Sequence, residues 1–290
     1  MPSAIPSQHH KEIEENGYTV IRDFLTQEEI DQYKKLSNKL IDISRAGNWP
    51  FIRINGKQFP PWDSEDDKPD IWGVTHLMHP DFNDVGGKQY QLLYSSEKLL
   101  NIVKDILQTD EINMELLNML INPKLENFDL SWHRDDIKNT ATAEQETELL
   151  MKNAYAGCQF NLALCEDECL IVVPKSHTRP RTDEEREKLV FEEISNQLVV
   201  KLNPGDIAFY NPNILHRATY NCNKERITIH GCYGAKQLGA NRARLILQHG
   251  VGDWLDKFKP ISPKMEELYS NLRIMSDSFK GVKLGYSLDG

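Results

Sequence analysis

The stretch NFDLSWHRDD, residues 127–136, decides how the fold of this sequence is interpreted. Apolar residues alternate with polar ones up to His133, which is the period expected of a strand with one buried face. His133 and Asp135 are two residues apart, so a strand would turn both side chains to the same face. The pair is therefore either half of a metal site or part of a charged, solvated strand edge.

A second histidine–carboxylate pair with the same spacing occurs at His79-Pro80-Asp81. It lies in a proline-rich stretch, where Pro80 limits the pairing of the chain in a sheet. His79 is not followed by a comparable set of candidate ligands. We therefore favour the pair at 133 and 135, and we assign no functional role to His76, His79 or His249.

His216 is the candidate third ligand. It follows the apolar strand in GDIAFYNPNILHRATYN and lies 216 − 133 = 83 residues after His133. Two neutral imidazoles and one carboxylate on one face of a metal, with three positions left open, suit non-haem iron(II). Arg226 lies ten residues after His216, with Thr228 on the same strand face, and a guanidinium suits a carboxylate held by two parallel hydrogen bonds.

Composition narrows the class of protein. A net charge of −10 over 290 residues argues against a nucleic-acid binder or a binder of anionic membranes, since both need a basic face. No apolar run approaches the roughly 18 residues that span a bilayer, and the N-terminus lacks the apolar region of a secretory signal. The odd count of five cysteines predicts free thiols in a reducing, cytoplasmic compartment. A zinc site from Cys165, Cys169 and Cys222 is a minor alternative, because the spacing fits no standard zinc motif.

The order of predicted elements indicates a helical first part followed by many short strands. Helices are expected at 8–16, from the capping box at 26–29 to Gly47, at 94–107, at 141–152 and at 182–193. Strands are expected at 17–25, 114–123, 127–133, 157–165, 169–174, 197–202, 205–211 and 226–234. Residues 48–90, rich in tryptophan, phenylalanine and proline, form a long irregular segment that is either a binding loop or a surface excursion. This pattern is typical of a sandwich or barrel with helices packed outside.

The order of His-x-Asp, a distant His and an Arg about ten residues later resembles the iron(II)- and 2-oxoglutarate-dependent oxygenases. Two further stretches are similar to the phytanoyl-CoA dioxygenase family: NLALCEDECLIVVPKSH at 161–177 and PGDIAFYNPNILHRATYNCNKERI at 204–227. The opening ENGYTVIRDFLTQEEIDQYKKL, residues 15–36, resembles the first strand and helix of that family. The resemblance covers roughly residues 10–235.

This resemblance implies a fold that is mainly β with flanking helices. Its core would be a double-stranded β-helix of the jelly-roll or cupin-like type, with N-terminal helices and a C-terminal extension. Residues 1–290 would then form a single oxygenase domain. Its helical part would cover about 8–107, its β-helix core about 113–235 and its extension 236–290.

The resemblance also implies the roles of individual residues. His133, Asp135 and His216 would be the catalytic iron ligands, and Arg226 would hold the distal carboxylate of 2-oxoglutarate. Further cosubstrate contacts are expected from Thr228, Asn118 and Asn161. With Fe(II), 2-oxoglutarate and O2, and with ascorbate as a supporting reductant, the enzyme would hydroxylate or otherwise oxidise a small organic metabolite and release succinate and CO2.

Several departures from the family pattern leave the substrate open. Arg134 stands where glutamine is usual, Asn161 where tryptophan is usual, and Asp167-Glu168 replaces an Asn-Gly turn. Lys175 replaces a glycine, and residues 137–157 read as an insertion. Halogenases of this superfamily have a small residue at the position of Asp135, so its carboxylate favours hydroxylation or a related oxidation.

Two other functions remain as alternatives: hydroxylation of a peptide or protein side chain docked along 48–90, and a non-catalytic barrel that binds a ligand or partner. The basic stretch VPKSHTRPR, residues 173–181, is either a solvated loop or an attraction for an anionic substrate. Asp136 is expected to be a surface charge rather than a ligand. His177 and His230 are expected to be structural or rim residues. The oligomeric state stays open.

Overall fold

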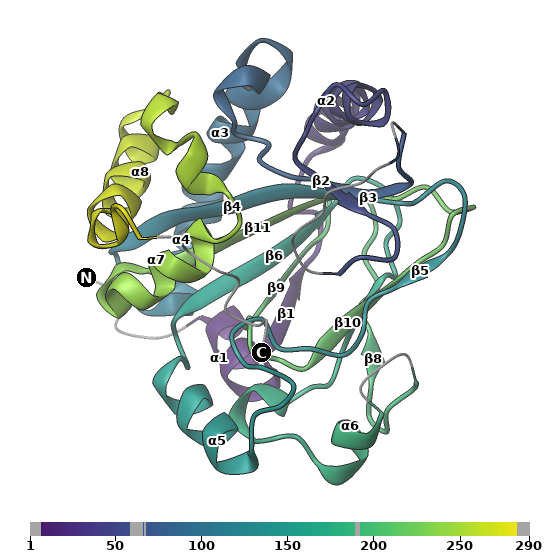
Figure 1. Ribbon diagram of the computed structural model, residues 1–290, viewed down its shortest axis with the longest axis vertical. Coiled ribbons are helices and arrows are strands. Elements are labelled where there is room, and N and C mark those ends of the chain that lie inside the picture. The colour runs from purple at the N-terminus through teal and green to yellow at the C-terminus, as the bar shows by residue number, and fades with distance from the viewer. Residues whose placement is uncertain (1–6, 59–65, 67, 189–191, 283–290) are drawn as a thin grey trace.

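The computed structural model describes residues 7–58, 66, 68–188 and 192–282, and gives only the backbone of 238–241. Its strands form two sheets, in which the paired strands are antiparallel (Figure 1). The larger sheet has the order β1-β9-β6-β11-β4-β3-β2, and the smaller has the order β5-β10-β7-β8. Among the described residues, no helix is long and apolar enough to span a membrane.

The larger sheet is built around the long central strands β4 (Ile112–Ile121) and β11 (Ile227–Ala235). On the other side of β11 lies β6 (Gly157–Ala163), so that His230 is opposite Asn118 on β4 and Asn161 on β6. The remaining strands are β1 (Tyr18–Ile21), β9 (Ile207–Tyr210), β3 (Ile71–Val74) and β2 (Ile52–Ile54). This register aligns three polar side chains across the middle of the sheet.

Alternation along β11 separates two environments. Ile227, Ile229 and Tyr233 belong to the main hydrophobic core, which also contains residues of the covering helices. Those helices are α2 (Gln27–Arg45), α3 (Lys88–Tyr94), α4 (Glu97–Leu107) and α8 (Pro263–Ser276). Thr228 and His230, one residue out of phase, point to the opposite face because a strand repeats every two residues. Since the helices cover one face of the larger sheet and the polar side chains lie on the other, a polar binding site is expected between the two sheets.

The smaller sheet faces the polar side of the larger one and contains β5 (Phe128–Asp129), β10 (His216–Tyr220), β7 (Leu170–Val172) and β8 (Leu198–Val199). Between the sheets, Trp72 of the larger one packs with Leu130, Ala218 and Tyr220 of the smaller side. Two facing antiparallel sheets with helices outside confirm the predicted double-stranded β-helix with flanking helices.

The structure corrects the prediction in three segments. Within 48–90, expected to be irregular, β3 pairs with β4 and β2 pairs with β3, so both extend the larger sheet. These strands have only three or four residues each, and β3 finds its partner far along the chain, so no local pattern indicates them. Residues 59–65 and 67 of that segment, including Phe59 and Trp62, lie outside the described residues. The helix expected at 94–107 is α4, which begins only after the Ser96 cap, and a separate helix, α3, precedes it where an irregular segment was predicted.

The third correction concerns the helix expected at 182–193, which begins at the Thr182 capping box but is only α6 (Asp183–Glu187). Residues 189–191 lie outside the described residues. The other helices are α1 (Gln8–Asn16) and α5 (Ala143–Lys152), both expected, and α7 (Gly239–Leu247), which with α8 forms the C-terminal extension.

Candidate active site

The two histidines are brought together by an isolated backbone bridge between His133, which follows β5, and His216 at the start of β10. The His133 N–H donates to the His216 carbonyl at 2.9 Å, and the His216 N–H donates to the His133 carbonyl at 3.1 Å. Directly opposed residues of an antiparallel pair carry their side chains on the same face. The two rings accordingly lie with their centroids 4.3 Å apart.

Both imidazoles present Nε2 to the same point, because each Nδ1 is engaged by a backbone carbonyl. Nδ1 of His133 lies 2.7 Å from the Ser131 carbonyl oxygen, and Nδ1 of His216 lies 2.8 Å from that of Ile214. A carbonyl oxygen only accepts, so Nδ1 carries the proton in each ring and Nε2 carries the lone pair. Asp135 completes the group, with its carboxylate oxygens 3.6 Å from Nε2 of His133 and 3.9 Å from Nε2 of His216.

The protonation states also suit a cation. Burial lowers the pKa of His133 to about 4, with the neighbouring His216 acting in the same direction, so the ring is neutral near pH 7. Burial alone would raise the pKa of Asp135, but the two histidines outweigh it and the pKa is lowered. The Gln159 side-chain amide also donates to this carboxylate. In the described part of the chain, these three residues are the only group of His, Cys, Asp or Glu side chains close enough to share a metal ion.

The rival sites do not assemble. His79 accepts a hydrogen bond from the Asp81 backbone N–H, and its ring packs edge-on against Trp49 and Trp254. The His79–Asp81 pair gains no third ligand among the described residues. The cysteines are free thiols, and no zinc group forms from them in the described part of the chain.

Arg226 lies in the wall of the same cavity as the triad and is 3% exposed. Its Nε donates to the Asp167 carboxylate at 3.0 Å, and its guanidinium lies over the Tyr220 ring at 4.6 Å. Nη1 and Nη2 are buried without a hydrogen-bond partner in the described structure. Burial disfavours the charge, but Asp167 raises the pKa overall, so the guanidinium stays charged. Two unsatisfied, parallel donors of a buried cation match a carboxylate in the fork geometry that arginine favours.

The other expected cosubstrate residues have different surroundings. Thr228 donates its hydroxyl to Asp167 and so supports the carboxylate that holds Arg226. Asn161 lines the cavity, where its Oδ1 lies 2.9 Å from Nδ1 of His230. Asn118 accepts a hydrogen bond from the His76 N–H at 3.0 Å and is not among the residues that line the cavity.

His230 was expected to be structural or at the rim, but the structure places it in the cavity wall. Burial, followed by the charge of Arg53, lowers the pKa of His230 to about 3, and the charges of Asp135 and Arg226 also act on it. The ring is therefore neutral and lies within electrostatic reach of both ends of the site. The alternation of strand side chains could have indicated that His230 and Gln159 face the cavity, because they lie two residues from Thr228 and Asn161 respectively on the same strands.

The cavity around these groups has about 970 Å³ of empty space, counting its open mouth. Apolar side chains from both sheets and from α7 line much of it, among them Leu116, Leu130, Leu170, Leu245 and Ile246. The polar lining outside the triad includes Arg53, Gln159, Gln248 and His249. His249, to which we assign no role from the sequence, therefore lies in the wall of the candidate substrate space.

Comparison with known proteins is consistent with this geometry. The family model described as phytanoyl-CoA dioxygenase (PhyH) matches residues 13–227. The chain belongs to the PhyH family. The enzyme class predicted from the sequence, a non-haem iron(II)- and 2-oxoglutarate-dependent dioxygenase, is the class of this family and is confirmed. No curated protein gives a significant match to this PhyH member.

Solved structures share the fold of this PhyH chain at low sequence identity. AviO1 from Streptomyces viridochromogenes Tue57 is 18% identical with a TM-score of 0.57, over 81% of this chain and 96% of its own. EctD from S. alaskensis, solved with 2-oxoglutarate and 5-hydroxyectoine, is 14% identical with a TM-score of 0.57, over 81% and 78%. The 2-oxoglutarate-dependent epimerase SnoN from nogalamycin biosynthesis is 14% identical with a TM-score of 0.53, over 79% and 82%.

Proposed function

We propose that this PhyH member binds Fe(II) through His133, Asp135 and His216 and binds 2-oxoglutarate through Arg226. It would hydroxylate, or otherwise oxidise, a small organic molecule and release succinate and CO2. One observation carries this proposal: the cavity that contains the triad also contains a buried arginine with two donors that lack partners. That combination suits a metal together with a dicarboxylate.

The donor set fits iron, which supplies the activation of O2 and the oxidative splitting of the keto acid when it is bound. The chain's own residues fix the geometry. The carbonyls of Ser131 and Ile214 hold the two rings through Nδ1, so that both Nε2 atoms would be free to bind the metal, as is typical of ligating histidines. The Gln159 amide holds the Asp135 carboxylate. With these three protein ligands, a bound iron would have positions open for the cosubstrate and for O2.

Asp167 prepares the other end of the cosubstrate site. It engages Nε of Arg226 and the Thr228 hydroxyl, so the two Nη groups are left for the distal carboxylate. Asn161 and His230, which bond each other on neighbouring strands, are the polar groups we assign to the space between this anchor and the metal ligands. We assign Asn118 to support of the His76 backbone rather than to direct cosubstrate contact.

A small molecule is the substrate class that suits this cavity best. Its walls come from both sheets and from α7, and they combine apolar side chains with a few polar ones. The relatives whose structures are similar include EctD, solved with 5-hydroxyectoine, and SnoN, solved in another crystal with nogalamycin RO. The basic stretch 173–181 does not argue for an anionic substrate, because Arg179 and Arg181 are engaged by Glu185 and Glu146.

The test measures succinate formed from 2-oxoglutarate by the purified protein with Fe(II), ascorbate and O2, without added substrate. We expect slow uncoupled turnover that Asp135→Ala abolishes. Asp81→Ala, which removes the exposed carboxylate of the rival pair, is the matched control and should keep wild-type turnover. Absence of succinate from the wild-type protein would favour the non-catalytic barrel. Equal turnover by Asp135→Ala would remove the metal-site assignment.

A screen then separates the two enzymatic alternatives. Candidate small molecules and candidate peptides are added to the same assay, and the stimulation of succinate release is compared. We expect small molecules to stimulate turnover. Stimulation by peptides alone would favour the protein side-chain hydroxylase.

A further inference from the structure

The tetrapeptide His133-Arg134-Asp135-Asp136 contains two charged residues that are not in the ligand group, and both side chains are buried. The Arg134 side chain is 0% exposed and the Asp136 side chain is 4% exposed. Burying a charge is costly unless a partner compensates it, so each needs a specific neighbour. The partners come from two segments outside the β-strands.

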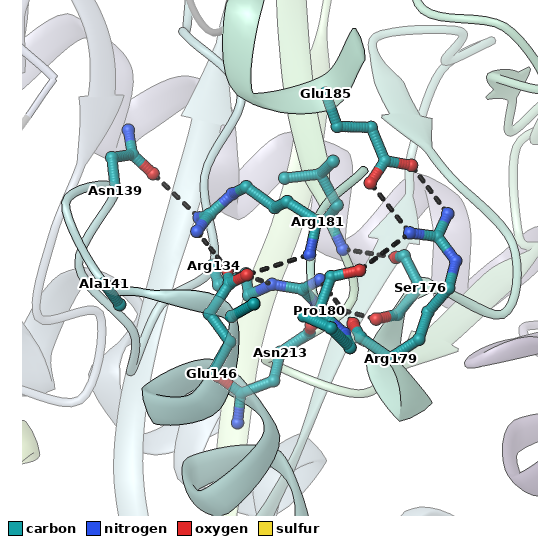
Figure 2. Close-up of polar contacts among 12 residues, drawn as sticks. Arg134, Asn139, Ala141, Glu146, Ser176, Arg179, Pro180, Arg181, Glu185 and Asn213 are labelled. Carbon is teal, nitrogen blue, oxygen red and sulfur yellow. Dashed lines mark hydrogen bonds and ion pairs between the residues drawn. The ribbon is translucent and has the colours of Figure 1, made fainter. Parts of the chain in front are cut away.

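Arg134 is held by backbone carbonyls and by α5. Its Nη1 donates to the carbonyls of Ser176, at 2.9 Å, and Asn213, and its Nη2 donates to that of Arg179 at 3.0 Å (Figure 2). Its Nε lies 3.5 Å from the Glu146 carboxylate of α5. Three carbonyls and one carboxylate therefore fix a side chain whose backbone joins two ligand residues.

Glu146 is itself fully buried and forms ion pairs with several arginine side chains. Its carboxylate accepts from the Arg181 guanidinium, from the Arg181 backbone N–H at 2.8 Å and from the Arg186 guanidinium at 2.5 Å. Glu146 belongs to the stretch 137–157, which reads as an insertion relative to the family. The stretch 137–157 and the arginine at position 134, both of which depart from the family pattern, are therefore linked, because Glu146 in this stretch supplies a carboxylate beside the buried Arg134 guanidinium.

Asp136 is held from the other side by α7. Nη1 of Arg242 lies 3.2 and 3.4 Å from the two Asp136 oxygens, and Nδ2 of Asn213 donates to Asp136 at 3.3 Å. Arg242 is 4% exposed, and its Nε and Nη2 bond both oxygens of Glu115 on β4 at 2.7 and 2.5 Å. Helix α7 begins after residue 227, where the family match ends. The expected surface position of Asp136 is therefore wrong, because a distant arginine covers it.

We infer that Arg134 and Asp136 are positioning residues for the iron-ligand loop, and that Glu146 on α5 and Arg242 on α7 hold them. The inference rests on the proposed function. Arg134 precedes Asp135 and Asp136 follows it, and the ion pairs of these two side chains restrain the backbone that carries the Asp135 carboxylate. Loss of either partner leaves an uncompensated buried charge, and its relaxation moves Asp135 relative to His133 and His216. Displacements of about 1 Å at such sites have large effects.

The test is a titration of the purified apoprotein with Mn(II), followed by calorimetry, which does not depend on turnover. Glu146→Gln keeps the side-chain volume, Arg242→Gln shortens the side chain, and each removes one charge. We expect each to weaken Mn(II) binding about 10- to 100-fold, the usual effect of losing a residue that supports metal ligands. Arg242→Lys, which keeps the charge toward Asp136, should recover part of the affinity.

Glu185→Gln is the matched control. It removes a similarly buried carboxylate that pairs with an arginine, although Arg179 is 37% exposed, and the Glu185 carboxylate bonds Arg179 and Thr182 rather than Arg134. Its Mn(II) affinity should stay within about threefold of wild type even if its melting temperature falls. Equal loss of affinity in the control would make the effect one of general stability and would overturn the inference.

The failures are distinguishable. Folded Glu146→Gln and Arg242→Gln proteins with wild-type Mn(II) affinity would overturn the positioning roles and leave the proposed function intact. A wild-type protein that binds no Mn(II) would overturn both. If Glu146→Gln does not fold, Asp136→Asn decides in its place, since it removes only the charge that Arg242 opposes; it should weaken binding at least tenfold, and unchanged binding would refute the role of Asp136.

Discussion

Replacement of Arg226 by glutamine should separate its two interactions, one with Asp167 and one with the cosubstrate. The variant leaves the Asp167 carboxylate, 3% exposed, without its charged partner, and breaking a buried pair in this way costs about 3–5 kcal/mol of folding stability. It also removes both Nη donors. Hydrogen bonds to charged groups contribute roughly 1.5–3 kcal/mol each, so two of them correspond to a 10²- to 10⁴-fold weaker binding of 2-oxoglutarate.

The double variant Arg226→Gln/Asp167→Asn distinguishes these effects. Removal of both charges should restore most of the stability, measured by urea unfolding, because no buried charge is left unpaired. The apparent KM for 2-oxoglutarate, measured by succinate release, should stay raised by at least 100-fold. A double variant whose KM lies within about threefold of wild type would refute the assignment of Arg226 as the anchor. A single variant as stable as wild type would refute the buried pairing with Asp167.

Three further predictions concern stability. Burial lowers the pKa of His76 to about 3, so the unfolded chain takes up a proton below pH 6.5 that the native state does not, and the folding stability should fall as the pH drops. In urea unfolding, His76→Gln should reduce the stability lost between pH 7 and pH 5 by about 2 kcal/mol. An unchanged pH dependence of stability would contradict the buried, neutral state of His76. A Cβ on Gly231 would lie 2.5 Å from the Phe160 ring on the neighbouring strand, so Gly231→Ala should cost about 1–3 kcal/mol. A neutral effect would show that the side chains of adjacent strands are less closely packed here. Thr26 accepts from the Glu29 N–H at the start of α2, so Thr26→Ala should cost about 1 kcal/mol, and no change in melting temperature would contradict the cap.

Local sequence patterns predicted those features that depend on residues near one another in the chain. Alternation along 127–133 and 226–234 gave the strand faces, and so the shared direction of Arg226 and Thr228. The capping boxes at Thr26 and Thr182 gave the starts of their helices. The convergence of residues 133 and 216 came from resemblance, since 83 residues separate them and no local pattern joins them.

The pairings that surround the site were not predictable from such patterns. Asp167 reads as a turn residue, and only the fold brings it beside Arg226, 59 positions away. Asp136 reads as a surface charge because its partner, Arg242, lies 106 positions further on. Strand β3 likewise pairs with an edge of β4 that becomes available only when the sheet forms, and β2 in turn pairs with β3. Long-range electrostatic and edge pairings therefore account for most of the differences between sequence and structure.

The position of one bound metal ion tests the central claim most directly. A crystal of the protein grown with Mn(II) and 2-oxoglutarate, examined at a wavelength where manganese scatters anomalously, would locate the ion without any assay. The account predicts a single strong peak bonded to Nε2 of His133, Nε2 of His216 and the Asp135 carboxylate, with the distal carboxylate of 2-oxoglutarate on the Nη groups of Arg226. A metal bound elsewhere, or a cosubstrate carboxylate that does not contact Arg226, would contradict it.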